Sequence, residues 1–399
     1  MTQTKLRTGL ILLIGALGVL QPFSLDPYLA NIDFIAADLK VGTTLIAQNL
    51  TALTLGIAVG SVVAGPMSDA IGRRRPVLMA LTGYILAAIL ASTATSVEIF
   101  FTGRIFQGFF AACAAVVANA MLRDLYEGLL LIKAMGRSML LMGSSWFIGP
   151  IFGSYLQSFT DWRGLGYILA AVAAFLLVLI FFKLPDTMSL EDRTKSTAKE
   201  VTTRFLHLLK DRVFLGLVFI QSTISISLFA YLSVSPFVYG GAYNVAPAEV
   251  GIFLSINSVG AYIGSQIGAR LSQLIKPQYA LLISLAVGSA SGLGLMFTAT
   301  MNLGFLAFTA FLAIFALGFG ISATPVLGLA MASHPGEAGT AAAVVLVAGT
   351  VASTIAGAYY AILDKTSAIG IGFTQFAFMA IGIIILFTVV RPKQLEIMK

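Results

Sequence analysis

Gly65-Pro-Met-Ser-Asp69-Ala-Ile-Gly72-Arg73-Arg74-Arg75-Pro76 decides the fold class of this chain, because it places four charges between two apolar runs, 42–64 and 77–95. Lys and Arg accumulate in short loops on the cytoplasmic side of a membrane. Glycine lets two helix ends approach closely, and Asp69 can hold an Arg or cap the next helix. The stretch predicts a tight cytoplasmic connection between two spanning helices, with an ordinary basic turn as the alternative.

The composition excludes a soluble protein. Of 399 residues, 58% are hydrophobic and only 10% are charged, with a mean hydropathy of +0.95. A soluble chain carries about 25% charged residues. The net charge of +7 does not indicate a nucleic-acid partner, because the basic residues form no contiguous face with interleaved aromatic residues. The composition predicts a polytopic protein whose surroundings are the lipid bilayer.

The sequence shows no set of residues typical of a cofactor site or of catalysis. Cys113 is the single cysteine, which excludes a disulfide framework. We find no metal-ligand cluster, no phosphate-binding Gly-Lys-Ser/Thr loop and no plausible Ser/His/Asp set. We therefore expect neither cofactor nor metal, and we disfavour an ATP-driven pump.

Twelve apolar stretches of about 18 to 26 residues are long enough to cross a bilayer core of about 30 Å. The first follows Lys5 and Arg7 and imitates a signal peptide, but no convincing small-residue cleavage site follows, so we expect an uncleaved span. The predicted spans are 8–31, 42–66, 76–96, 99–122, 138–160, 164–183, 213–238, 248–269, 278–298, 303–330, 338–361 and 369–390.

Positive charges predict the orientation of these spans. If both termini are cytoplasmic, 20 of the 24 Lys and Arg residues fall in cytoplasmic segments, with Lys40, Arg163 and Lys365 outside and Arg104 within a span. A long polar segment divides the chain into residues 1–184, a linker at 185–212 with a surface helix near 198–210, and residues 213–399. Two halves of six spans are typical of a duplicated all-α membrane transporter. A monomer suffices for this architecture.

Span one carries the carboxylates of greatest interest. Asp26 lies within or at the end of an apolar helix, where a carboxylate is costly and marks a functional hypothesis. It faces a water-filled cavity if the helix is long or breaks at Pro22 and Pro27, and it is a solvated or capping residue if it reaches the surface. Asp33 lies closer to the outside, where we expect solvation.

Span four carries an arginine inside an apolar run. Arg104 and Gln107 are one turn apart on one face. An Arg there can attract an anion, pair with a carboxylate or modulate a proton acceptor, whereas the alternative is snorkelling to the headgroups. At the inner end of the span, Arg123 and Asp124 are interpreted as a gate or as a salt bridge to the Arg73–Arg75 stretch.

Span five is rich in small residues. Gly149, Pro150 and Gly153 predict close helix contact and a kink. Helix packing alone accounts for such a pattern in any polytopic protein.

Several of these motifs resemble those of the major facilitator superfamily. Gly65 through Arg75 resembles the loop between its helices 2 and 3, Arg104-x-x-Gln107-Gly108 its fourth-helix motif, and the Gly-Pro pattern of span five its antiporter motif. The segments 229–238 and 257–271 look like those of the bicyclomycin-resistance (Bcr/CflA) drug:proton antiporters. Span one keeps Asp26 to Leu29 of that family but has Ala30-Asn-Ile-Asp33 where Pro-Ala-Leu-Pro is usual, which makes the outer end of the helix more polar.

The resemblance implies a twelve-helix fold of two six-helix bundles around a midplane cavity, exporting a small, partly apolar compound in exchange for protons. Two alternatives stay open: a facilitator or symporter for a nutrient or metabolite, and a membrane receptor or enzyme. The residues expected to act are for proton coupling Asp26, Arg104 and Asp33; for substrate binding Asp26, Tyr28, Asn31, Gln107, Asn119, Gln221, Tyr231, Tyr239 and Asn257; and for gating Gly65, Asp69, Gly72, Arg73, Arg74, Arg123, Asp124, Gly149, Pro150 and Gly153.

Overall fold

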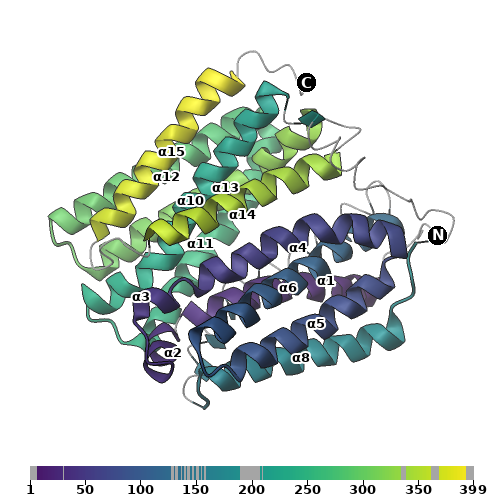
Figure 1. Ribbon diagram of the computed structural model, residues 1–399. Coiled ribbons are helices and arrows are strands. Elements are labelled where there is room, and N and C mark those ends of the chain that lie inside the picture. The colour runs from purple at the N-terminus through teal and green to yellow at the C-terminus, as the bar shows by residue number, and fades with distance from the viewer. Residues whose placement is uncertain are drawn as a thin grey trace. The chain divides into compact units, whose positions relative to one another are not determined.

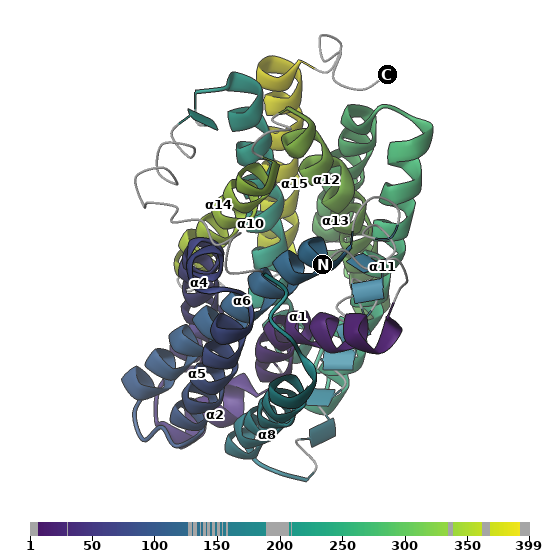
Figure 2. The ribbon, with the colours of Figure 1, turned by 90° about the vertical axis from the view of Figure 1, so that its right-hand side faces the viewer.

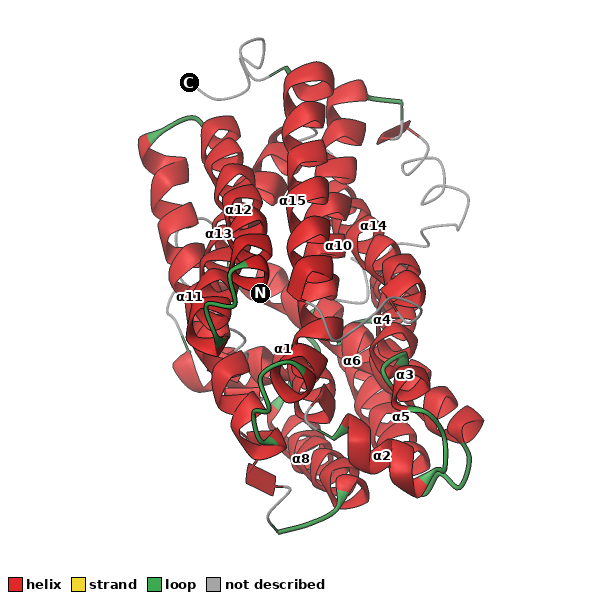
Figure 3. Ribbon diagram, turned by 90° about the vertical axis from the view of Figure 1, so that its left-hand side faces the viewer, coloured by secondary structure: helices red, strands yellow, loops and turns green. Residues whose placement is uncertain are grey.

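Long apolar helices make up most of the computed structural model, and the described residues contain no strand (Figure 3). The structure describes residues 7–29, 31–126, 130, 134–135, 137–138, 141, 144–145, 148–149, 152–153, 155–156, 159–188, 207–208, 210–333, 338–360 and 368–391. The chain divides into two compact units, Met1–Val201 and Thr202–Lys399, called unit 1 and unit 2 below. This boundary falls inside the predicted linker, which lies mostly outside the described residues.

Unit 1 is built around α6 (Figures 1 and 2). This helix packs against α1, α4 and α5, and α8 packs against α1 and α5. The helices of unit 1 are α1 Thr8–Leu29, α2 Ile32–Asp38, α3 Thr43–Ile46, α4 Asn49–Ile71, α5 Arg74–Ser92, α6 Val97–Leu125 and α8 Trp162–Lys183.

In unit 2, α13 packs against α11 and α12, α12 also packs against α15, and α10 packs against α14 and α15 (Figure 1). Its helices are α10 Arg212–Gly241, α11 Pro247–Leu274, α12 Pro277–Thr300, α13 Phe305–Ser333, α14 Ala338–Tyr360, α15 Ala368–Ile385 and the π-helical turn η2 Leu386–Val390.

Ten helices in the described part of the chain are long and apolar enough to cross a membrane, and α14 contains a shorter apolar stretch, Val344–Gly357. The predicted spans coincide with these helices to within a few residues. The exception is the fifth, 138–160, of which only scattered residues are described. Many leucine, isoleucine, valine and phenylalanine side chains on the helices are exposed, as expected for surfaces that face lipid.

The stretch Gly65–Pro76 differs from its prediction as a loop. Helix α4 continues through Gly65 and Pro66 to Ile71, and α5 already begins at Arg74. Gly72 ends α4 with a φ of 90°, a left-handed conformation that glycine adopts at least cost. The expected close approach at Gly65 is wrong, since a Cβ there would meet nothing within 4 Å.

Close helix approach instead occurs along α4 and α6. A Cβ on Gly56 would lie 1.9 Å from the carbonyl oxygen of Ile105, and one on Gly108 would lie 2.0 Å from that of Leu53. Unit 2 repeats this arrangement between α11 and α13, where a Cβ on Gly264 would lie 2.1 Å from the carbonyl oxygen of Leu317. Small residues at such contacts let two backbones pack directly, which is a typical basis of helix association in membranes.

The short helix α2 was not predicted. Its last residue, Asp38, forms an ion pair with Arg163 at 2.7 Å and accepts a hydrogen bond from the Trp162 indole at 3.1 Å. Arg163 also donates to the carbonyl oxygens of Ser92 and Ala94, at 2.8 and 2.7 Å. Arg163, at the start of α8, therefore bonds to both α2 and the end of α5.

Candidate functional site

Arg104 lies at the centre of unit 1 with its side chain fully buried. Its Nε donates to the side-chain oxygen of Asn49 on α4 at 2.5 Å, and one terminal nitrogen donates to that of Gln107 at 2.5 Å. The other terminal nitrogen donates to the backbone carbonyl of Ser24 on α1. The fork of a guanidinium can serve three acceptors on three helices at once, which an ammonium group cannot.

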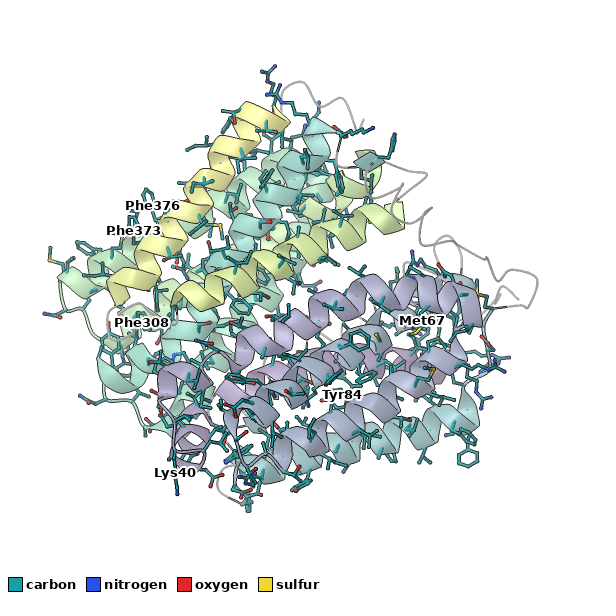
Figure 4. The ribbon with its side chains drawn as sticks, viewed as in Figure 1. Lys40, Met67, Tyr84, Phe308, Phe373 and Phe376 are labelled. Carbon is teal, nitrogen blue, oxygen red and sulfur yellow. The ribbon has the colours of Figure 1, made fainter. Side chains whose placement is uncertain are left out.

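Two tyrosines complete the environment of Arg104. The guanidinium lies 4.0 Å from the centre of the Tyr28 ring, a cation–π contact. The Tyr84 hydroxyl, on α5, accepts from the Gln107 amide at 3.1 Å and lies 2.7 Å from the Ser24 hydroxyl. Figure 4 labels Tyr84 within unit 1. Four helices thus meet at one polar cluster, defined by Ser24, Tyr28, Asn49, Tyr84, Arg104 and Gln107 and called the Arg104 cluster below.

The hydrogen bonds of the Arg104 cluster have a fixed direction. The Ser24 hydroxyl donates to the carbonyl of Leu20 at 2.6 Å, so its proton is committed. Tyr84 must therefore donate to Ser24, and its oxygen accepts from Gln107. Donation runs from Arg104 through Gln107, Tyr84 and Ser24 to a helix carbonyl.

No carboxylate among the described side chains forms an ion pair with Arg104. A buried cation without a counter-ion is costly, and neutral oxygens compensate it only in part. The arrangement therefore attracts negative charge to this level of the membrane.

Asp26 belongs to α1 and follows Ser24 by two residues, so its backbone lies at the level of the Arg104 cluster. Its side chain lies outside the described residues. Next to it, the backbone of Pro27 lies so close to Gly153 that a Cβ on this glycine would approach within 2.5 Å. The rings of Phe23 and Phe152 also meet, with centroids 5.8 Å apart. The described residues of the predicted span five therefore pack along α1 beside Asp26.

A second charged cluster lies where α4 meets α5. Arg73, largely buried, forms ion pairs with Asp69 on α4 and with Asp124 on α6, the latter at 2.8 Å. Its Nη1 also donates to the Ser68 hydroxyl at 2.8 Å, and its backbone N–H donates to Asp186 at 3.0 Å. Burial disfavours the charged form of Arg73, but its bonds to Asp124 and Asp69 outweigh burial and raise the pKa of Arg73.

The Arg73 cluster, defined by Ser68, Asp69, Arg73, Asp124 and Asp186, contains the ion pair expected between Asp124 and the Arg73–Arg75 stretch. Arg74 lies outside it and donates to the Phe181 carbonyl at 2.5 Å. Arg123 is exposed. Gly149 is buried in the predicted span five, and Pro150 lies outside the described residues.

Three other predicted residues of unit 1 lie apart from the Arg104 cluster. Asp33 is exposed in the first turn of α2, as expected for a solvated carboxylate. Asn31 is buried and its amide caps the end of α1 by donating to the Pro27 carbonyl at 3.0 Å. Asn119 is exposed on α6.

In unit 2 the predicted residues divide into two groups. Gln221 donates to Ser225 at 3.1 Å, and the buried Tyr231 ring lies 6.4 Å from Phe315. Tyr239 and Asn257 are both fully buried. The Tyr239 ring packs against Phe308, which Figure 4 labels, and its hydroxyl bonds to Thr309 at 2.9 Å.

Sequence reasoning missed Ser24 and Asn49, which accept from Arg104, and Tyr84, which accepts from Gln107. Each is a polar residue in an apolar run, which is a weak signal because serine and threonine hydroxyls commonly bond to their own helix. It also missed Gln375 on α15, a fully buried carboxamide whose side-chain atoms have no hydrogen-bond partner.

Comparison with known proteins agrees with this architecture. Two solved structures share the fold: a D-xylose-proton symporter (TM-score 0.75, 16% identity, 96% of this chain and 98% of that one) and XylE from E. coli in a partially occluded inward-open conformation (TM-score 0.73, 14% identity, 95% and 96%). At these identities the likeness concerns the fold alone.

Relatives found by sequence comparison have higher sequence identity to this chain than those solved structures. The "Uncharacterized MFS-type transporter YdgK" of Bacillus subtilis is 30% identical over 98% of this chain and 97% of its own length. The "Bicyclomycin resistance protein homolog" of Haemophilus influenzae is 30% identical over 96% of both chains, and the "Multidrug resistance protein MdtL" of Escherichia coli is 26% identical over 78% of this chain and 79% of its own.

The model of the Major Facilitator Superfamily matches residues 12–357. The all-helical fold, the loop motif at Gly65–Arg75 and the nearly full-length relatives agree with that match. The chain belongs to the Major Facilitator Superfamily and is a multi-pass membrane transporter.

Proposed function

We propose that this protein exports small, partly apolar compounds across the bacterial cytoplasmic membrane in exchange for protons. The names of two relatives, a bicyclomycin resistance protein homolog and a multidrug resistance protein, support export of drugs. The observation that carries the proton coupling is the fully buried Arg104 guanidinium, held by neutral acceptors at the level of Asp26 on α1.

Asp26 is the proton carrier in this proposal. In this proposal Asp26 releases its proton when substrate binds and takes one up from the outside when substrate leaves, with Arg104 tuning the exchange. Because Asn49, Gln107 and the Ser24 carbonyl do not titrate, they hold the guanidinium in one place through both protonation states of Asp26. Protonation from outside then competes with substrate, as an exchanger requires. Asp33, exposed on α2, is the second candidate carrier.

The Arg73 cluster serves as a cytoplasmic latch of one of the two alternating states. It joins the start of α5 to the ends of α4 and α6 through ion pairs that are partly shielded from water, where they are worth more than on the surface. In this proposal both termini are cytoplasmic, which the distribution of Lys and Arg supports.

Liposomes with a trapped pH dye test the proposal. Addition of bicyclomycin, antibiotics, dyes or amino acids to purified protein should move protons when one of them is a substrate. Asp26→Asn should abolish this movement, whereas Asp33→Asn, the matched control, should preserve it.

Each contrary result has a definite meaning. Coupled export that survives Asp26→Asn refutes the carrier assignment. Loss in Asp33→Asn alone transfers the role to Asp33. Equilibration of a labelled compound without proton movement identifies a facilitator, and uptake driven by an inward proton gradient identifies a symporter.

A further inference from the structure

A directed chain of hydrogen bonds also crosses unit 2. The Thr309 hydroxyl on α13 donates to the carbonyl of Phe305 at 2.9 Å, so its proton is committed. The Tyr239 hydroxyl on α10 lies 2.9 Å from Thr309 and must therefore be the donor of that pair. The remaining lone pairs of Tyr239 can only accept.

Asn257 on α11 lies within reach of this acceptor. Its side chain is fully buried, and it faces the Tyr239 hydroxyl, although neither amide atom completes a hydrogen bond of normal geometry. Since the Tyr239 oxygen can only accept, the amide must turn its N–H₂ group toward it. The amide oxygen is then left as a buried acceptor without a donor, a condition that native structures rarely leave unfilled.

Unit 1 shows what fills the same position there. Its chain has the same order of groups: the carboxamide of Gln107, the hydroxyl of Tyr84, the hydroxyl of Ser24 and a helix carbonyl. At its head the Gln107 amide oxygen accepts from Arg104. In unit 2 the corresponding amide oxygen, that of Asn257, has no donor. Helices α10 to α13 carry charged residues only near their ends, at Arg212, Glu249 and Arg270.

A second buried group without a partner lies close by. Ser235 is four residues before Tyr239 on α10, is fully buried, and its hydroxyl has no hydrogen-bond partner. The stacked rings of Tyr239 and Phe253, with centroids 5.5 Å apart, set the level of α10 against α11. Ser235 and Asn257 each lie one turn from that stack in the same direction, because the two helices run antiparallel.

We propose that Asn257 and Ser235 bind a neutral N–H or O–H group of the exported compound, which donates to the Asn257 amide oxygen as Arg104 donates to Gln107. The Ser235 hydroxyl donates a hydrogen bond to an acceptor atom of the same ligand group. The aromatic rings around Tyr239, including Phe253 and Phe308, pack on the apolar body of the ligand. A cationic group is disfavoured, since these helices offer no internal carboxylate to balance it. This inference rests on the proposed function but concerns selectivity alone.

Benzamide and N,N-dimethylbenzamide are the probes, because they share a ring and a carbonyl and differ in the N–H donors. Binding of each is measured by saturation-transfer NMR on the full chain in nanodiscs, with empty nanodiscs subtracted. The wild-type protein should bind benzamide at least fivefold more tightly, and Asn257→Leu should reduce the difference to less than twofold. Ser235→Ala is a smaller change and should weaken the binding of benzamide several-fold. This variant tests the proposal even if Asn257→Leu does not fold.

Gln375→Leu is the matched control, since it removes another fully buried carboxamide of unit 2 and should leave the preference intact. Equal binding of both probes to the wild-type protein, as expected if the site holds only a water molecule, overturns the inference. So does a preference that persists in Asn257→Leu. The measurement uses no proton gradient, so it succeeds or fails independently of the coupling assigned to Asp26.

Discussion

The guanidinium of Arg104 lies 4.0 Å from the centre of the Tyr28 ring, and both side chains are fully buried in unit 1. The negative face of the ring stabilises the desolvated guanidinium, whose hydrogen-bond partners are all neutral. Because Tyr28 is on α1 and Arg104 on α6, the contact also joins the helix that carries Asp26 to the helix that carries the charge.

Loss of the Tyr28 ring should therefore cost more than loss of its hydroxyl. Tyr28→Leu should lower the free energy of unfolding by about 2 kcal/mol or more, since it removes a desolvated cation–π contact together with buried area. Tyr28→Phe keeps the ring and removes a hydroxyl that has no hydrogen-bond partner, so it should be neutral or slightly stabilising. Melting of the purified variants measures both, and a larger loss in Tyr28→Phe would contradict the assignment.

Replacement of Arg104 by lysine should separate charge from geometry. Arg104→Lys keeps the positive charge, but its ammonium group cannot reach acceptors on α1, α4 and α6 together. We expect substrate-driven proton movement to fall at least tenfold while the protein still inserts and purifies. Gln107→Glu tests the other end of the contact, because a carboxylate there would neutralise Arg104 and should also block exchange. Unchanged exchange in both variants would show that the buried charge has no part in coupling.

The ion pair of Arg73 and Asp124 should show strong coupling in a double-mutant cycle. We expect an interaction free energy of about 1–2 kcal/mol between Arg73→Ala and Asp124→Ala, above that of surface pairs, because Arg73 is largely buried. Chemical denaturation of the four proteins measures this value. The same cycle with the exposed Arg123 in place of Arg73 is the control and should give a value close to zero.

The pH dependence of that pair follows from the raised pKa of Arg73. A base whose pKa is higher in the folded state stabilises the protein fully below its unfolded-state pKa, which for arginine lies far above neutral pH. The contribution of Arg73 should therefore be constant between about pH 6 and pH 9. A coupling energy that declines across this range would show that a different group titrates in the cluster.

Glycine substitutions should separate close contact from open space on a single helix. Gly56→Ala places a methyl group 1.9 Å from the Ile105 carbonyl oxygen, so α4 and α6 must move apart at a cost of about 1–3 kcal/mol. Gly65→Ala, nine residues later on α4, meets nothing within 4 Å and should stabilise the helix by up to about 1 kcal/mol. Melting temperatures that shift in the same direction for both variants would contradict this packing.

Hydropathy predicted the long helices because a spanning helix must satisfy its own backbone and present apolar side chains to lipid. The end of α4 was placed too early because Ser68 and Asp69 lower the hydropathy there, although both positions stay helical. The short helix α2 carries no signal long enough to detect, whereas α3 lies inside the predicted span 42–66. Arg104 was identified from its charge in an apolar run, but two of the three neutral acceptors that hold it come from other helices, α1 and α4, and no local pattern encodes such an arrangement. Tyr239 and Asn257 of unit 2 were likewise recognised singly, whereas Thr309 and Ser235 were missed, and the order of donation depends on contacts between α10 and α13.

The hydrogen-bond chain of unit 1 ends at the Leu20 carbonyl. A helix carbonyl cannot take up a proton and pass it on, and every hydroxyl along the chain has already committed its own. The hydrogen-bond chain therefore does not conduct protons. A one-way series of hydrogen bonds that ends at a carbonyl holds the buried cation in place without forming a path along which protons could leak through unit 1.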